Sequence, residues 1–185
     1  MLKKTIFATL IAVLMLTTGC SKEKQNTEAN ELKPTNKYVL TSTDDNNFTF
    51  VKKGNGFVLE GSEDKILIFD IFATWCPPCQ KAAQHMGALQ KKYKDKIVVF
   101  GVSIEDNLNN QQLKEFKKMY HADYNILNSN LNRVLADKIV ATLNMGNRYP
   151  IPVVVLYKNG KYITHYVGSV EEEFVQSDIE QALKQ

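Results

Sequence analysis

The chain has 185 residues, of which 44% are hydrophobic and 23% are charged, and its formal net charge is +3. These values are typical of one globular domain with residues to spare, and they exclude a collagen-like, a disordered or a multi-span membrane chain. Two lysines lie within residues 1–19, which hold no acid, so the remaining chain carries 21 basic against 20 acidic residues. This near neutrality gives no electrostatic footprint for nucleic acid, so no nucleic-acid partner is expected.

Residues 1–19 have the features of an export signal. Two lysines near the start precede the apolar stretch IFATLIAVLML at residues 6–16, and the small residue Gly19 directly precedes Cys20. The apolar stretch is shorter than the roughly 20 residues that a membrane-spanning helix needs. The segment resembles the lipoprotein signal, or lipobox, of bacteria, although Thr17 stands where that signal usually has Leu. The alternative is an ordinary secretory signal followed by a chance cysteine.

Cys20 is the expected lipidation site. The resemblance to the lipobox implies that Cys20 is acylated, becomes the mature N-terminus and anchors an exported protein to a membrane, facing the periplasm or the cell exterior. Residues 20–36 interleave Lys with Glu and have no apolar periodicity, which predicts a flexible tether. The chain has three cysteines, so lipidation of Cys20 leaves Cys76 and Cys79 as a pair.

The first half of the remaining chain reads as four strands and a helix. Short strands are predicted at 38–42, 48–52 and 57–59, because the turn signals DDNN and KGNG separate them. Residues 66–72, ILIFDIF, form a nearly continuous apolar run, which indicates a central strand buried on both faces. Apolar residues recur every three or four positions over 77–94, which predicts a helix.

The second half alternates strands with helices and closes with a hairpin and a final helix. The predicted strands are 97–103, 124–127, 152–157 and 161–167. The predicted helices are 108–120, 129–143 and 171–184. Strands that alternate with helices in this way predict an α/β sheet with helices covering both faces.

The motif ATWCPPC at residues 73–79 stands where a buried strand ends and a helix begins. At a helix N-terminus, free backbone N–H groups and the helix dipole favour an anion, and therefore the reactive thiolate of Cys76. Cys79 lies one helical turn further and can attack a mixed disulfide formed at Cys76. A metal site is not expected, because zinc needs four ligands and the sequence has neither a second cysteine pair nor clustered histidines.

These residues resemble the thioredoxin superfamily, and specifically its membrane-tethered TlpA-like branch. Besides the motif at 73–79, the resemblance rests on Asp70, six residues before Cys76, and on the sequence Pro-Ile-Pro that enters the strand near 153. It implies an α/β thioredoxin fold over residues 37–185, with a central mixed sheet flanked by helices. It also implies an N-terminal β extension and an insertion, at about 104–150, before a cis-proline strand.

The resemblance implies a role for several residues. Asp70 would be a buried acid that moves a proton to or from Cys79, unless it is a solvated edge residue. No lysine partner for it is evident in the neighbouring strand VVFGVS, and the acids that follow that strand, Glu105 and Asp106, are expected to be solvated. A substrate-binding face is expected around the cysteines, formed by Trp75, Pro77, Pro78, Ile151 and Pro152.

Within this face the alternatives differ from residue to residue. Pro152 would form a cis peptide bond, with Ile151 offering its backbone to the substrate chain, unless Pro152 is a plain strand-entry proline. Trp75 would offer a flat apolar contact, unless it simply packs.

The direction of electron flow follows from the two prolines. Pro77 and Pro78 have no backbone N–H, so two donors that could hold the Cys76 thiolate are absent. This predicts a modestly lowered pKa of Cys76 and a reducing potential, because strong oxidants of this kind stabilise their reduced form. We therefore expect a reductase of disulfides in exported proteins.

The resemblance implies apocytochromes c among the substrates and a membrane electron donor as a partner. No cofactor is expected, because the chain has no nucleotide-binding glycine pattern. Two other functions stay open: an oxidase or isomerase of disulfides, and a tethered binding lipoprotein in which Cys76 and Cys79 form only a structural disulfide.

Overall fold

A computed structural model describes residues 36–146 and 148–184 of the chain. The predicted signal at 1–19, Cys20 and nearly all of the predicted tether lie outside the described residues. No helix within the described ranges has the length and apolarity to cross a membrane.

A five-stranded mixed sheet forms the centre of the domain, in the order β6-β5-β4-β7-β8. Its strands are β4 (Ile66–Phe72), β5 (Ile97–Ser103), β6 (Asn125–Leu127), β7 (Val153–Lys158) and β8 (Lys161–Val167). β4 is parallel to β5 and antiparallel to β7. All seven residues of β4 are buried, which confirms the central strand predicted from its unbroken apolar run.

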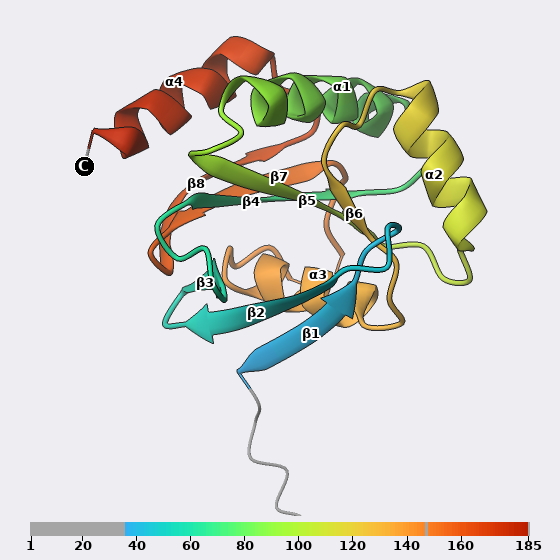
Figure 1. Ribbon diagram of the computed structural model, residues 1–185, viewed down its shortest axis with the longest axis horizontal. Coiled ribbons are helices and arrows are strands. Elements are labelled where there is room, and N and C mark those ends of the chain that lie inside the picture. Colours follow the sequence, from blue (N-terminus) through green and yellow to red (C-terminus); the bar gives the residue numbers. More distant parts are fainter. Residues whose placement is uncertain (1–35, 147, 185) are drawn as a thin grey trace, which may run out of the picture. The chain divides into compact units, whose positions relative to one another are not determined.

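Helices cover the two faces of this sheet (Figure 1). They are α1 (Pro77–Lys92), α2 (Asn110–Met119), α3 (Asn132–Ala141) and α4 (Glu172–Leu183). Side chains of α1, α2 and α4 pack with Ile68 and Phe72 of β4, whereas those of α3 pack with Phe69 and Ile71. This division follows from the alternation of side chains along a strand, and it places residue 70 on the α1 face.

A separate antiparallel sheet precedes the central one and is the predicted N-terminal β extension. It consists of β1 (Lys37–Thr41), β2 (Asn47–Lys53) and β3 (Gly56–Leu59), in that order. Phe50 of β2 packs edge to face on Phe100 of β5, with ring centroids 4.8 Å apart, so this sheet lies on the α3 side of the central sheet. The predicted fold is therefore confirmed, with helix ends that differ by a few residues because end turns fray.

The topology brings three distant segments to one edge of the sheet. β4 runs directly into the loop that precedes α1, and its residue Ile71 pairs with Val153 at the start of β7. This register places Pro152 beside the end of β4, next to the loop that holds the cysteines. β5, parallel to β4, ends at the same edge, so the residues that follow Ser103 also reach this loop.

Candidate active site

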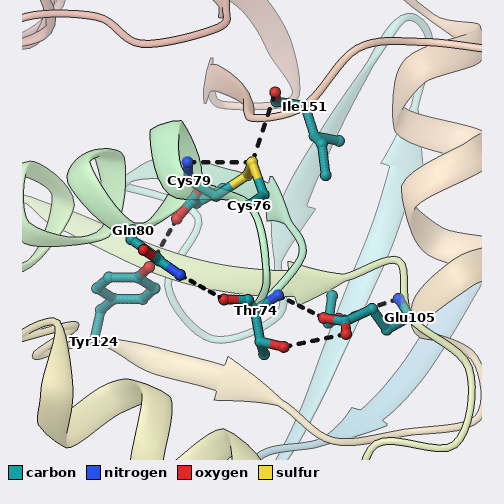
Figure 2. The surroundings of a disulfide bond; sticks show 9 residues. Thr74, Cys76, Cys79, Gln80, Glu105, Tyr124 and Ile151 are labelled. Atoms are coloured by element: carbon teal, nitrogen blue, oxygen red, sulfur yellow. Dashed lines mark hydrogen bonds between the residues drawn. A yellow bond between two sulfur atoms is a disulfide. The ribbon is translucent and has the colours of Figure 1, made fainter.

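Cys76 and Cys79 form a disulfide at the start of α1, with their Cα atoms 5.2 Å apart (Figure 2). Cys76 is the N-cap residue, and Pro77 and Pro78 occupy the first two helical positions, where a missing N–H leaves no intrahelical bond unmade. The backbone N–H of Cys79 donates to Sγ of Cys76 at 3.3 Å. The two prolines thus leave one backbone donor on this sulfur, and only Cys76 retains any exposed surface.

The loop before β7 faces the cysteine pair. The peptide bond between Ile151 and Pro152 is cis, as the resemblance implied, and Sγ of Cys76 lies 3.9 Å from the carbonyl oxygen of Ile151 (Figure 2). Pro152 is buried and its carbonyl accepts a hydrogen bond from the N–H of Gly168 at 2.8 Å. Ile151 is half-buried, so it is the residue of this pair with surface left for a partner.

An apolar surface surrounds the pair on the helix side. Trp75 is 67% exposed and does not pack into the core, and Pro77 and Pro78 are exposed as well. A large exposed aromatic side chain next to a buried sulfur is unusual for a residue with a purely structural role.

A hydrogen-bond network that the sequence reading missed holds the loop before Cys76. The carboxylate of Glu105 accepts hydrogen bonds from both the backbone N–H and the hydroxyl of Thr74, and Gln80 donates to the Thr74 carbonyl at 2.9 Å (Figure 2). The expectation that Glu105 is a solvated loop charge was therefore wrong, whereas its neighbour Asp106 is exposed. The sequence position of Glu105 could have indicated this contact. Glu105 follows a strand that is parallel to the strand leading into the ATWCPPC motif, and parallel strands end at the same edge of the sheet.

This network makes a testable contribution to stability. Glu105→Ala leaves the Thr74 N–H without its acceptor, and hydrogen bonds to charged groups contribute about 1.5–3 kcal/mol when buried. Because Glu105 is half-buried, we expect the free energy of unfolding in urea to fall by about 1–2 kcal/mol. Asp106→Ala is the matched control and should change it by less than about 0.5 kcal/mol. Equal losses in the two variants would contradict this assignment.

Asp70 is completely buried, so it is not a solvated edge residue. Its Oδ2 accepts a hydrogen bond from the hydroxyl of Tyr124 at 2.7 Å, and its Oδ1 has no partner among the described residues. Burial raises the pKa of Asp70 to about 7, and the hydrogen bond from Tyr124 partly opposes this. Tyr124 was not found from the sequence, because it lies 54 residues away and carries no local motif.

The arrangement is suited to the exchange of two thiols for a disulfide. It combines a sulfur at a helix N-terminus, a second sulfur within bonding distance, and a buried carboxyl whose pKa lies near neutrality. Among residues 36–146 and 148–184, no three His, Cys, Asp or Glu side chains are grouped so that they could hold a metal ion.

The fold and the paired cysteines define the class: a thioredoxin-like protein with a Cys-x-x-Cys disulfide at the start of its first helix. Residues 28–183 match the family model described as Redoxin, and the chain belongs to this family.

Relatives and solved structures agree with this class. The thiol-disulfide oxidoreductase ResA of Bacillus cereus is 26% identical over 122 residues, which cover 65% of this chain and 65% of that protein. The thioredoxin family thiol:disulfide interchange protein of Chlorobium tepidum has a TM-score of 0.60 at 19% identity, over 81% of this chain and 95% of that one. The pneumococcal exposed lipoprotein thioredoxin of Streptococcus pneumoniae has a TM-score of 0.54 at 17% identity, over 78% and 98%.

The two solved structures share the fold of this chain, whereas the sequence relatives are matched over only part of their length. The chain spans between 29% and 65% of the length of the matched relatives from Drosophila melanogaster and the bacilli.

Proposed function

We propose that the protein is a thiol–disulfide oxidoreductase that reduces disulfides in exported proteins through Cys76 and Cys79. The observation that carries the proposal is the disulfide in the first turn of α1, with Sγ of Cys76 facing the cis Ile151–Pro152 loop and the exposed Trp75 alongside. Membership of the Redoxin family and the similarity to ResA support it.

The first step uses the reduced protein. The Cys76 thiolate attacks one sulfur of the substrate disulfide, so a Cys76–substrate disulfide forms, the substrate S–S bond breaks and the other substrate sulfur leaves as a thiolate. Cys76 is the attacking residue because its sulfur caps the helix and keeps access to solvent, whereas Cys79 is completely buried.

The second step releases the substrate. Cys79 loses its proton to the carboxylate of Asp70 and attacks the Cys76 sulfur, which forms the Cys76–Cys79 disulfide and frees the second substrate thiolate. Cys79 is buried on the α1 face of β4, the face on which Asp70 also lies, and the buried side chains of the described residues include no cation. In total, two electrons pass from the protein dithiol to the substrate disulfide. Cys76 loses its proton to solvent before the attack, Asp70 passes the Cys79 proton on to solvent, and each substrate thiolate takes up one proton from solvent.

The substrate chain would lie across the surface formed by Trp75, Pro77, Pro78 and the Ile151–Pro152 loop. Trp75 and the two prolines offer apolar contact, and the backbone of Ile151 can pair with an extended chain. Because Pro152 is buried, its part is to shape this loop, and the direct contact would come from Ile151.

The reducing direction rests on the helix start. With Pro77 and Pro78 in place, the Cys79 N–H is the one backbone donor on the Cys76 sulfur, so the thiolate gains limited stabilisation and the disulfide form is favoured. A reductase outside the cytoplasm needs a supply of electrons, and we propose a membrane protein as the donor. In this view lipidated Cys20 tethers the domain beside the membrane, facing the periplasm or the exterior, and apocytochromes c are among its substrates.

The equilibrium reduction potential of the Cys76–Cys79 pair tests the direction. We expect a value near or below that of thioredoxin, about −270 mV, in a dithiothreitol or glutathione series. A value near that of DsbA, about −120 mV, would identify a disulfide donor, and the argument from the two prolines would be wrong. Pro78→His should raise the potential by some tens of millivolts, because it restores the N–H of the second helical position, which can donate to the N-cap sulfur, and adds a titratable imidazole near Cys76.

A further inference from the structure

The carboxyl of Asp70 has a neutral partner instead of a cation. Asp70 is the one charged residue among the buried polar side chains of the described chain, and the Tyr124 hydroxyl donates to its Oδ2 at 2.7 Å. Tyr124 is itself only 4% exposed and stands just before β6, two strands away from β4 in the sheet. Its ring must therefore cross β5 to reach the carboxyl.

Gly101 provides the space for that crossing. It is the residue of β5 that pairs directly with Asp70 of β4. A Cβ atom at this position would lie 3.0 Å from Cε2 of Tyr124 and 3.1 Å from Cε1 of Phe72. Both contacts are shorter than ordinary van der Waals separation, so a methyl group here would require the Tyr124 and Phe72 rings to shift by a few tenths of an ångström. The Tyr124 ring thus lies beside Gly101 of β5, and its hydroxyl reaches Asp70 of β4.

The titratable groups around Asp70 are few. The buried layer on its face holds Cys76 and Cys79 of α1 and Tyr124, and its rim holds Tyr93, Tyr120 and Tyr166. Val154 of β7, which flanks Asp70 on the other side, is apolar. Burial raises the pKa of Tyr124 well above its ordinary value, so this residue remains a hydrogen-bond donor across the physiological pH range.

We infer that Tyr124, in the space left by Gly101, is a positioning residue that fixes Oδ2 of Asp70 and leaves Oδ1 to exchange the proton of Cys79. The inference rests on the proposed function, because it gives the proton transfer its geometry. A phenol stabilises the carboxylate by a hydrogen bond but adds no positive charge, so Asp70 stays a weaker acid than beside an ammonium group. The pKa of Asp70 therefore stays near neutrality, where a carboxyl group can both accept and release the Cys79 proton.

The titration of Asp70 in the oxidised full chain tests this inference, because the cysteines do not titrate in the disulfide form. With aspartate labelled with ¹³C at the carboxyl, we expect the NMR midpoint of Asp70 to rise by about one pH unit in Tyr124→Phe. Tyr157→Phe is the matched control: it removes a buried hydroxyl, 3.2 Å from Thr142 Oγ1, on the other face of the sheet. It should leave the midpoint unchanged.

An isosteric change keeps the test valid if Tyr124→Phe folds poorly. 3-Fluorotyrosine at position 124 is a stronger donor of nearly the same shape, so the Asp70 midpoint should fall. The pH profile of disulfide reduction should move with the midpoint in both variants, and Tyr124→Phe should leave the profile of an Asp70→Asn protein unmoved.

The outcomes separate the inference from the proposed function. An Asp70 midpoint that ignores both changes at Tyr124 would overturn the positioning role, even if the protein reduces disulfides normally. A shifted midpoint in a protein that shows no thiol–disulfide exchange would overturn the proposed function, and the positioning role with it. A merely structural tyrosine would lower stability without moving either the midpoint or the profile.

Discussion

Cys79→Ser is expected to accumulate as a covalent complex with its substrates, whereas the native chain should show almost none. Without the second sulfur, the mixed disulfide at Cys76 has no internal attacker and persists until an external thiol releases it. The buried position of Cys79 supports this result, because no substrate sulfur needs to reach it. The complexes should appear on non-reducing gels of membrane and exported fractions and should disappear with dithiothreitol. Turnover in a disulfide-reduction assay should fall by at least about 100-fold.

Cys76→Ser is the matched control for this trap. It also removes the disulfide, and the two variants should lose similar stability, because a bridge across a sequence separation of 3 closes a very short loop. It should form no mixed disulfides, since Cys79 is inaccessible to a protein substrate. If neither variant formed complexes, the pair would be a structural disulfide of a binding lipoprotein. If both variants formed complexes equally, the two cysteines would not have distinct roles.

Asp70→Asn should make the protein more stable at pH 8 and leave its stability nearly unchanged at pH 4. The pKa of Asp70 is raised from the ordinary 3.8 to about 7 in the folded chain, first of all by burial. Between these values the unfolded chain has lost the proton and the folded chain keeps it, so native stability falls as pH rises from about 4 to about 7. Three pH units at 1.36 kcal/mol each give a loss of roughly 4 kcal/mol.

The measurement is the free energy of unfolding in urea across this pH range. The curves of the native and Asp70→Asn proteins should nearly meet at pH 4 and diverge above it, with the variant the more stable. Asp95→Asn, on the exposed turn before β5, is the control and should follow the native curve. Parallel curves for the native and Asp70→Asn chains would show that Asp70 does not titrate in this range.

The same substitution should impair catalysis while it improves stability. An amide cannot take the Cys79 proton, so resolution of the mixed disulfide near pH 7 should slow by about tenfold or more. A gain in stability together with a loss of rate is the expected result for a buried functional carboxyl. Burial of the carboxylate destabilises the folded chain, but the carboxylate is needed for the reaction. A stabilised variant with native rates at every pH would remove Asp70 from the proposed mechanism.

The sequence alone predicted the features that depend on neighbouring residues. The apolar run at 66–72 indicated a strand buried on both faces, and its seven residues are all buried. The ATWCPPC motif predicted both the helix start and the cysteine pair, because a cap, a first-turn proline and a one-turn spacing are local properties. The resemblance implied that Asp70 is a buried acid, and its position inside the apolar run agrees with the burial that the structure shows.

The partners of these residues were decided by the tertiary structure. Glu105 reaches Thr74 across 31 residues because two parallel strands end at one edge of the sheet. Tyr124 reaches Asp70 across 54 residues because Gly101 leaves a space in the strand between them. Composition and periodicity encode which face of an element is buried, but the identity of a buried polar contact depends on sheet order and register. The sequence by itself thus determined where the sulfurs lie, and only the folded chain decided which groups hold and tune the residues around them.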